Sequence, residues 1–502
     1  MTRPGVLAID EGTTGVTALV VGDDASVLGR GYAEFAQHFP RPGWVEHEPE
    51  EIWQATLTAC REALSTSGAR RGETEIAAVG ITDQRETAVL WDRSSLAAPR
   101  RAVVWQDRRS SGLCEQLRTA GHEARVAELT GLRLDPYFTA TKLAWLREND
   151  PDTWAGVQDG SLAVGTVDSY LVARLSGGAA HVTDASNASR TLLLDLATGT
   201  WSDELCELFG VPASALPEVV PSWGEVARTD PGAFLGLDVP IAGIAGDQQA
   251  ALFGQACYDV GDSKCTYGTG SFVLVNTGSQ AVPSVADGEL GGLLSTVAWM
   301  SPDGKLTYAQ EGSIFVTGAG IQWLRDGLQV IGSAVESEAL ARTVPDTGGV
   351  VFVPALTGLG APDWDPEARG LIIGITRGTT RAHIVRATLE AIVYQVRDVV
   401  STMETRVPVL RADGGASGND FLMQLQADQL GVPVERPQVQ ETTGLGAAFL
   451  AGLGCGVWSS TEELAGTWRL ERRFTPGGRD ENGYRRWRAA VARSKGWAAL
   501  VD

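Results

Sequence analysis

The sequence predicts an α/β protein made of two related lobes. Strand-like and helical stretches alternate along both halves of the chain, which is typical of this class. Two short Gly/Thr turns sit between β-prone runs, at Asp10-Glu11-Gly12-Thr13-Thr14-Gly15 and at Tyr267-Gly268-Thr269-Gly270-Ser271. Glycine lets backbone N–H groups approach an anion closely and threonine adds a hydroxyl donor. One such turn is weak evidence, but the pair predicts two phosphate-binding turns that close on a nucleotide from opposite sides.

The first half of the chain shows both kinds of element. Apolar β-prone runs predict strands over residues 6–9, 17–22, 76–81 and 240–245. Apolar residues at helical spacing predict helices over residues 50–64, 114–129 and 142–147. The chain restarts its opening pattern at Lys264, so we expect a boundary just after Gly254, with lobes of residues 1–254 and 255–502.

The second half repeats this organisation. Strands are expected over residues 350–354 and 407–412. Between them, residues 383–403 predict a long helix whose apolar stripe is Ile384, Ala387, Ala391 and Tyr394. A last helix is expected over residues 445–453, with small residues that would allow close backbone contact.

The composition is that of a folded globular protein with an excess of acidic residues. The chain has 502 residues, of which 43% are hydrophobic and 21% charged, and a formal net charge of −21. This length allows about two to four domains. Nucleic acids and anionic membranes require Lys and Arg in excess on one surface, so the composition argues against both as partners.

The cysteines and the N-terminus suggest a compartment. Six cysteines form no C-x-x-C pair, and the five histidines show no ligand spacing relative to them. We therefore expect reduced, mostly buried thiols. No apolar leader precedes the first strand, and no run approaches the roughly 18 apolar residues of a membrane span. These features predict a cytoplasmic enzyme.

Two aspartates at predicted strand ends are candidates for the chemistry. Asp10 enters the first Gly/Thr turn, where a carboxylate beside a phosphate requires a cation such as Mg²⁺; alternatively, it bonds its own turn. Asp247 follows the strand over residues 240–245, and strand ends are where open α/β sheets place their chemistry. It suits a general base for phosphoryl transfer to an alcohol, or it caps the next helix. Gln248 beside it can bond a neutral polar ligand.

Three further groups are weaker candidates. Asp83-Gln84-Arg85-Glu86-Thr87 offers donors and acceptors for a hydroxyl-rich ligand, although a solvated turn is the ordinary interpretation of such a string. Trp105 and Tyr137 can supply apolar walls or simply lie in the core. Asp413-Gly414-Gly415 is a third Gly-rich turn that can hold a purine or a ribose against the backbone.

Longer motifs resemble the FGGY family of carbohydrate kinases, and within it the members that phosphorylate glycerol. The resemblance covers nearly the whole chain. It is carried by Pro42-Gly43-Trp44-Val45-Glu46-His47, by Asp83-Gln84-Arg85-Glu86-Thr87, by residues 245–254 and by Leu356-Thr357-Gly358-Leu359-Gly360-Ala361-Pro362. Both general signatures of the family also occur, at residues 137–149 and 370–390.

The resemblance implies two actin-like (ribonuclease H-like) lobes with a nucleotide cleft between them. It further implies ATP and Mg²⁺ in the cleft, transfer of a phosphoryl group to glycerol, and a homo-oligomer. Asp247 matches the general base and, with Asp10, the metal site. Positions that match glycerol contacts are Arg85, Glu86, Trp105, Tyr137, Asp247, Gln248 and Phe272. Positions that match nucleotide contacts are Thr13, Thr14, Gly15, Thr269, Gly318, Gln322, Gly415 and Asn419.

The first turn departs from the family pattern. It carries Glu11, Gly15, Val16 and Thr17, where typical relatives have Gln-Gly-Thr-Thr-Ser-Ser-Arg. Two alternatives stay open: a kinase of another small polyol that uses the same base, or a catalytically silent polyol sensor on the same fold, which only this departure supports. Trp105 and Phe272 favour a three-carbon substrate, because larger polyols would need room at those positions.

Overall fold

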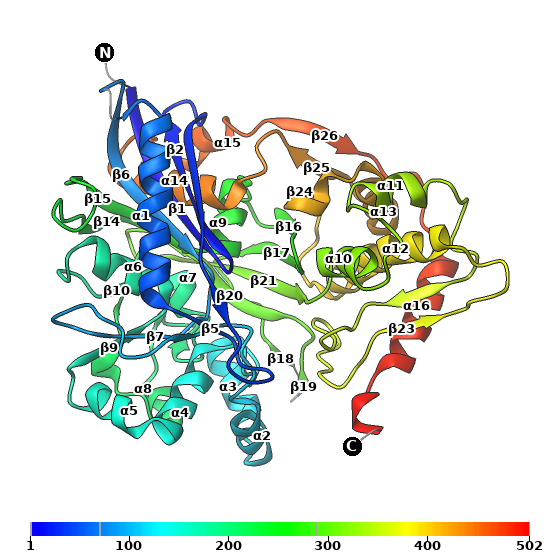
Figure 1. Ribbon diagram of the computed structural model, residues 1–502, viewed down its shortest axis with the longest axis horizontal. Coiled ribbons are helices and arrows are strands. Elements are labelled where there is room, and N and C mark those ends of the chain that lie inside the picture. Colours follow the sequence, from blue (N-terminus) through cyan, green and yellow to red (C-terminus); the bar gives the residue numbers. More distant parts are fainter. Residues whose placement is uncertain (1–2, 70–71, 287–288, 501–502) are drawn as a thin grey trace.

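The computed structural model describes residues 3–69, 72–286 and 289–500. Two lobes lie side by side, one formed by the N-terminal half and the other by most of the C-terminal half (Figure 1). Each lobe has a mixed β-sheet at its centre and helices against that sheet. The expected α/β class with two lobes is confirmed.

The first lobe is built on a six-stranded sheet. Its central strands are parallel, and a hairpin and one further strand run antiparallel at the edges. In spatial order the strands are β14 (Trp223–Arg228), β15 (Pro240–Gly246), β6 (Thr74–Asp83), β1 (Arg3–Gly12), β2 (Gly15–Gly22) and β3 (Val27–Glu34).

Strand β1 is apolar throughout its middle because both faces of the sheet are covered. Leu7 and Ile9 pack into a core cluster with α1 (Pro49–Thr66). Val6 and Ala8 point to the opposite face and join a different cluster. This alternation follows from the two-residue period of a strand.

The second lobe repeats the first sheet and adds one strand. The spatial order is β20 (Leu294–Met300), β21 (Leu306–Ile314), β17 (Ser271–Gly278), β16 (Ser263–Tyr267), β24 (Leu410–Asp413), β25 (Val434–Pro437) and β26 (Leu470–Phe474). From β21 to β26, the sequence of antiparallel and parallel pairings is the one that runs from β3 to β14. The two Gly/Thr turns therefore join equivalent strand pairs, β1–β2 and β16–β17, as a duplicated lobe requires.

Helices cover both sheets, and one of them differs from the prediction. The helix expected over residues 114–129 is two helices, because Gly121 adopts φ +85° between them. The remaining helices are α2 (Ser111–Thr119), α3 (Glu123–Thr130), α4 (Thr139–Asn149), α5 (Pro151–Gln158), α6 (Val167–Leu175), α7 (Ala185–Ala188), α8 (Asp203–Phe209), α9 (Asp247–Gly254), α10 (Gly318–Asp326), α11 (Glu336–Ala341), α12 (Arg381–Thr402), α13 (Asp420–Leu430), α14 (Thr442–Cys455), α15 (Thr461–Ala465) and α16 (Glu481–Ser494).

Short elements complete the chain. Turns of 3₁₀ helix occur at η2 (Ala213–Ala215), η3 (Gly415–Gly418) and η4 (Ala498–Leu500). The short strands are β4 (Gln37–His38), β5 (Glu46–His47), β7 (Val89–Asp92), β8 (Ala102–Val103), β9 (Leu162–Gly165), β10 (Val182–Asp184), β11 (Leu194–Asp195), β12 (Thr200–Trp201), β13 (Glu218–Val220), β18 (Val285–Ala286), β19 (Glu289–Leu290), β22 (Val351–Val353) and β23 (Leu371–Ile373). Over the described ranges, no helix is long and apolar enough to cross a bilayer.

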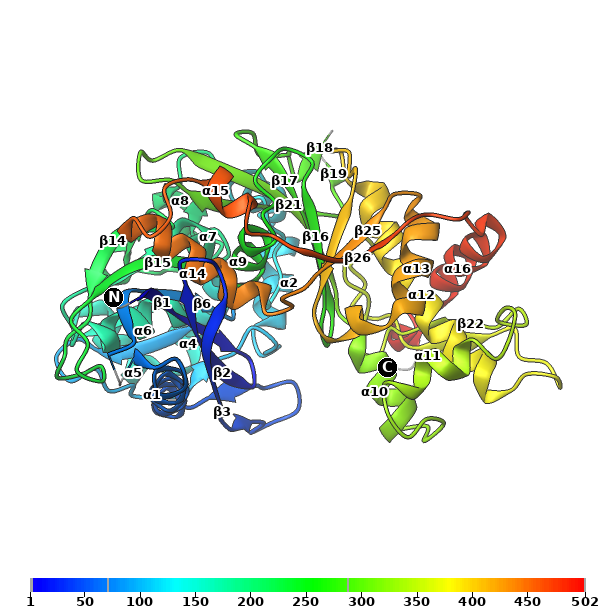
Figure 2. The same cartoon turned by 90° about the horizontal axis from the view of Figure 1, so that it is seen from above.

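Helix α14 crosses back from the second lobe to the first. Figure 2 shows it beside β15 and α9, far from α12 and α13. Its fit depends on small residues: a Cβ at Gly446 would lie 1.8 Å from the carbonyl oxygen of Ala250, and one at Gly80 would lie 2.2 Å from that of Ala447. The core cluster around α14 also includes Leu274 and Trp299 of the second sheet, so the two lobes share buried apolar surface. The division at residues 254 and 255 stays a prediction.

Candidate functional site

The candidate site is built where three parallel strands of the first sheet end together. In the register of these strands, Asp10 of β1 lies beside Thr82 of β6, which lies beside Ala245 of β15. The next row holds Glu11, Asp83 and Gly246. The segments that follow β6 and β15 begin at Gln84 and Asp247, so this register brings the predicted polar string and the predicted base to one edge of the sheet.

Asp247 is the first residue of α9 and its carboxylate is held by three donors. The backbone N–H of Gln248 donates to Oδ1 (2.7 Å), and the Gln248 side-chain Nε2 donates to Oδ2 (2.9 Å). Arg85 Nε lies 3.1 Å from Oδ1. The helix N-cap is Gly246, so Asp247 does not serve as the cap. Its side chain remains 30% exposed, which leaves the carboxylate accessible to a ligand.

Arg85 and Glu86 belong to a buried ion network that spans both lobes. Arg85 forms two contacts with Glu311 of β21, at 2.6 and 3.2 Å. Arg190 bridges Glu86 (2.7 Å) and Glu311 (3.0 Å). Although burial raises the pKa of Glu311, the Arg190 and Arg85 guanidinium groups outweigh it and lower this pKa to about 2. The network fixes the direction of Arg85 toward Asp247.

Glu86 has an unusual backbone conformation at the same point. Its φ of +65° lies in the left-handed region that non-glycine residues rarely adopt. The strained turn is held by Thr139, whose hydroxyl donates to the Glu86 carbonyl (3.0 Å). Such strain persists where surrounding contacts impose it, and it occurs often at functional sites.

Aromatic rings form the walls of this region. The rings of Trp105 and Tyr137 meet edge to face with centroids 5.6 Å apart. The Arg85 guanidinium lies 5.7 Å from the centre of the Phe272 ring. Trp105 Nε1 donates to the hydroxyl of Thr13 (3.0 Å), which links the walls to the first Gly/Thr turn. The structure therefore brings together every residue that the resemblance places at glycerol.

Asp10 carries a carboxylate that no described side chain neutralises. Within residues 3–69, 72–286 and 289–500, no hydrogen bond or ion pair to its side chain occurs. Burial, and then the nearby Asp247 carboxylate, raise the pKa of Asp10 to about 7. Asp10 and Asp247 are two like charges that face the same space, so a cation bound between them would reduce their repulsion. Mg²⁺ commonly takes one or two protein carboxylates and completes its shell with phosphate and water, so the pair Asp10 and Asp247 fits that ion. The described residues contain no cluster of three or more His, Cys, Asp or Glu ligands.

Two more buried carboxyl groups lie directly behind Asp10. Glu11 accepts from Gln84 Nε2 (2.9 Å), and its Oε2 has no hydrogen-bond partner among the residues that the structure describes. Asp83 accepts from Asn187 Nδ2 (2.9 Å). Burial raises the pKa of both Glu11 and Asp83 well above the ordinary range. Burial therefore disfavours the charged form of both carboxyl groups.

The second Gly/Thr turn packs against the start of α10. The N–H groups of Thr317 and Ala319 donate to the carbonyl of Thr269 (2.9 and 3.0 Å), and that of Gly318 donates to Gly268 (3.0 Å). A Cβ at Gly318 would lie 2.6 Å from the Gly268 oxygen, so only glycine fits there.

The remaining residues expected at the nucleotide lie beside this turn. Gly414 touches the Tyr267 backbone closely, with an added Cβ only 2.7 Å from its carbonyl oxygen. Gly415 follows in open space, and Asn419 caps α13 by accepting from the N–H of Leu422 (2.9 Å). Gln322 is exposed on α10. The turn, α10 and η3 thus form one backbone-lined wall of the second lobe.

The first Gly/Thr turn exposes hydroxyl groups above a buried glycine. Thr13 is partly buried under Trp105 and Thr14 is exposed. Gly15 is buried. A Cβ at this position would lie 2.9 Å from the Tyr32 hydroxyl and 2.7 Å from the Ala33 carbonyl oxygen, so a side chain has no room there. Thr13 and Thr14 therefore offer hydroxyl groups at the surface of the turn, whereas Gly15 lies beneath it.

Four residues of the site escaped the sequence reasoning. Glu311 and Arg190 complete the ion network, Gln249 accepts from Arg85 (3.1 Å), and Lys264 contacts Gln248. Glu311, Arg190 and Lys264 are single charged residues with no local motif to mark them, whereas Gln249 lies in the motif at residues 245–254 but was given no role. No strand was predicted at Lys264 or Glu311, so neither residue could be recognised as a charge inside a strand.

The cysteines behave as expected. All six are free thiols, and all but Cys455 are buried. Burial raises the pKa of Cys265 to about 12, so this thiol is protonated and unreactive at neutral pH.

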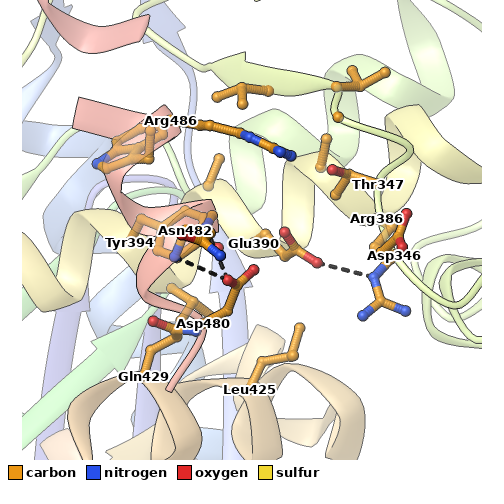
Figure 3. Close-up of a pocket in the computed structure, with 18 of the residues that line it drawn as sticks. Asp346, Thr347, Arg386, Glu390, Tyr394, Leu425, Gln429, Asp480, Asn482 and Arg486 are labelled. Atoms are coloured by element: carbon orange, nitrogen blue, oxygen red, sulfur yellow. Dashed lines mark hydrogen bonds and ion pairs between the residues drawn. The ribbon is translucent and has the colours of Figure 1, made fainter. Parts of the chain in front are cut away.

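A separate cavity lies in the second lobe and is not part of this site. Its volume is about 560 Å³, and none of the predicted site residues lines it. Figure 3 shows residues of its wall, among them Glu390 and Tyr394 of α12 and Asn482 and Arg486 of α16. Glu390 is bonded by Arg386 (2.9 Å).

Family models and known proteins match the chain over nearly its full length. The N-terminal domain of the FGGY family of carbohydrate kinases matches residues 5–254, and the C-terminal domain of that family matches residues 263–455. A glycerol kinase of Symbiobacterium thermophilum is 51% identical over an alignment of 506 residues, which covers 99% of this chain and 100% of that protein.

Solved structures match as well. The crystal structure of Plasmodium falciparum glycerol kinase with ADP has a TM-score of 0.89 at 33% identity, and the match covers 98% of each chain. A gluconate kinase from Lactobacillus acidophilus has a TM-score of 0.84 at 20% identity, covering 99% of this chain and 98% of that one. The second match supports the fold alone.

Proposed function

Because the chain belongs to the FGGY family of carbohydrate kinases, we propose that it transfers the γ-phosphoryl group of ATP to a terminal hydroxyl of glycerol. The observation that carries the proposal is the Asp247 carboxylate. It stands at the edge of the first sheet, is held by three donors on one side and is open on the other. Two of the similar proteins described above are glycerol kinases, and the structure of one of them contains ADP.

Glycerol would bind between Arg85, Glu86 and the aromatic walls. The Arg85 guanidinium donates to a hydroxyl oxygen, and the Glu86 carboxylate accepts a hydroxyl hydrogen. Trp105 and Phe272 would pack against the carbon chain, and Tyr137 would present its hydroxyl at the end of the site. Fixed donors and acceptors of this kind select a small polyol by the hydroxyls that they satisfy.

The reaction requires one proton transfer and one phosphoryl transfer. The terminal hydroxyl donates its proton to Asp247 while its oxygen attacks the γ-phosphorus. The bond between that phosphorus and the β,γ-bridging oxygen breaks, and ADP leaves. The contacts from Gln248 and Arg85 hold the Asp247 carboxylate in one orientation at the edge of the sheet.

The nucleotide would bind to the two Gly/Thr turns and the adjacent wall of the second lobe. Thr13, Thr14, Thr269 and Gly318 would contact phosphates, and Gln322, Gly415 and Asn419 would contact the nucleoside, whereas Gly15 would shape the turn from below. When Mg²⁺ is bound, it would be held by Asp10 and Asp247 and would neutralise charge on the phosphates. The free thiols fit a reducing compartment such as the cytoplasm. The homo-oligomer stays a prediction.

A coupled assay of ADP release across a panel of small polyols tests this function. With saturating Mg²⁺ and ATP, we expect turnover with glycerol and little with four- and five-carbon polyols. Preference for a longer polyol would favour the first alternative, a kinase of another substrate. Calorimetric binding of glycerol without ADP release would identify a silent sensor instead.

Asp10→Asn should stabilise the ligand-free protein while it weakens metal binding. In the folded state the pKa of Asp10 is raised to about 7. Its contribution to stability is therefore fully present below the ordinary pKa of an aspartate and is lost as the pH rises toward 7. Asparagine avoids this loss, so at pH 8 without Mg²⁺ the variant should gain about 1–3 kcal/mol in the free energy of unfolding.

Urea unfolding at pH 8 and pH 5 measures this effect. The difference between variant and wild type should shrink at pH 5, and Mg²⁺ with ATP should raise the unfolding midpoint of wild type more than that of the variant. A variant that is less stable than wild type at pH 8, with an unchanged response to Mg²⁺, would contradict the assignment of Asp10 to the metal.

A further inference from the structure

A buried lysine lies behind the proposed base. Lys264 is completely buried on β16 of the second lobe. Its Nζ donates to Gln248 Oε1 (2.5 Å) and to the Thr266 hydroxyl (2.9 Å). Neither contact is an ion pair, so the position is not explained as a salt bridge within the fold.

The strand geometry turns Lys264 toward the first lobe. Neighbouring side chains of a strand point to opposite faces. Cys265 packs into the core of the second lobe, and Lys264 and Thr266 therefore face the other way, where α9 of the first lobe begins. Burial lowers the pKa of Lys264, and the carboxylates of Asp413 and Asp247 oppose that shift. These two carboxylates therefore offset part of the effect of burial on the pKa of Lys264.

The contact fixes the orientation of an amide. A glutamine side chain carries an acceptor and a donor on nearly identical branches. An ammonium group has only donors, so Lys264 can bond only the oxygen branch of Gln248. The nitrogen branch must then face Asp247, where Nε2 donates to Oδ2 (2.9 Å). A 180° turn of the amide would place two oxygens against each other at the base.

We propose that Lys264 is a positioning residue for phosphoryl transfer, which holds the Gln248 amide in the one orientation that donates to the catalytic carboxylate of Asp247. The inference rests on the proposed function, because the contact between Lys264 and Gln248 has a catalytic role only if Asp247 is the base. It also joins the lobes chemically: the base belongs to the first sheet, and the group that orients it belongs to the second.

The alternative is that Lys264 serves only to hold the lobes together. Arg411 is a matched control for that role, since it is the partner of Lys264 in the β16–β24 register and bonds the carbonyls of Gln255 and Ala256. In the part of the chain that the structure describes, its side chain forms no hydrogen bond or ion pair with a residue of the proposed site. Arg411→Met should lower the unfolding temperature without changing kcat of the folded enzyme.

Lys264→Met should lower kcat about 10- to 100-fold, the effect of losing one orienting hydrogen bond from a charged donor. KM for ATP should stay within about twofold, because none of the residues proposed to contact the nucleotide is touched. Lys264→Arg keeps a donor-only cation and should recover part of the rate. In the Gln248→Ala background, Lys264→Met should have little further effect on kcat, since the amide that it orients is gone.

Three results would overturn the inference. One is a folded Lys264→Met variant with kcat within about twofold of wild type. Another is an equal loss of kcat in the wild-type and Gln248→Ala backgrounds, which would mean that Lys264 acts independently of Gln248. The third is measured without turnover, on the side-chain amide resonance of Gln248, which is assigned by its absence in Gln248→Ala. If Lys264→Met left that resonance unshifted, the inference would be wrong. That measurement separates failure of this inference from failure of the proposed function, which would show as no ADP release by wild type.

Discussion

Asp247→Asn is expected to lower kcat by about 10²–10⁴-fold while glycerol binding stays largely intact, the range that general-base catalysis typically contributes. Asparagine keeps the size and planar shape of the side chain, but it cannot accept a proton from a hydroxyl. Arg85 and Gln248 would still find one oxygen acceptor at this position, so the site should keep its form. The coupled ADP assay measures kcat, and calorimetry measures glycerol affinity.

Asp203→Asn provides the matched control. Asp203 is also the first residue of a helix, α8, and is exposed away from the site. That variant should keep the wild-type kcat. This result would show that loss of a carboxylate at the start of a helix does not by itself lower kcat. If Asp247→Asn retained more than about a tenth of the wild-type kcat, the base would have to be another residue.

Local patterns along the chain predicted most of the fold. The runs that became β1, β6 and β15 are apolar on both faces, and a strand covered on both sides is recognisable by that alone. The duplicated lobe followed from two turns, because each joins the first antiparallel pair of its sheet. The division of residues 114–129 into two helices was missed because a single glycine at a positive φ broke an otherwise regular pattern.

The site was predicted where its residues cluster in sequence and missed where they do not. Arg85, Glu86, Asp247 and Gln248 follow strands directly, so the sheet edge collects them. Glu311 and Lys264 come from the middle of strands in the other lobe, and their importance depends on which residue lies opposite across the lobes. No spacing rule within one chain segment encodes that contact.

The departure of the first turn from the family pattern has a structural counterpart. Gly15 stands where relatives carry a serine, and here the Tyr32 ring and the Ala33 carbonyl occupy the space that a side chain would need. The turn is thus packed from below by β3, and Thr13 is held from above by Trp105. Its shape is maintained by neighbouring residues, which supports the kinase over the silent sensor.

Arg85→Ala is expected to raise KM for glycerol about 10- to 100-fold, because it removes a charged donor from a hydroxyl in a desolvated site. The structure adds a second effect that the sequence did not indicate. Glu311 is completely buried, and without Arg85 it keeps only Arg190 and Ser313 as side-chain partners in the described part of the chain. Breaking a buried pair by removing one partner costs about 3–5 kcal/mol, so the variant should also unfold at lower urea.

The two effects can be separated by neutralising both partners. Arg85→Met combined with Glu311→Gln leaves no unpaired carboxylate, and it should regain much of the lost stability while KM for glycerol stays high. Urea unfolding and the ADP assay on the same preparations measure both quantities. An unchanged KM in Arg85→Ala would move the substrate site elsewhere and leave Arg85 a structural role. If KM returned to the wild-type value in the double variant, the rise in Arg85→Ala would come from disruption of the network. A high KM in a stable double variant would instead require a direct contact between the Arg85 guanidinium and the substrate.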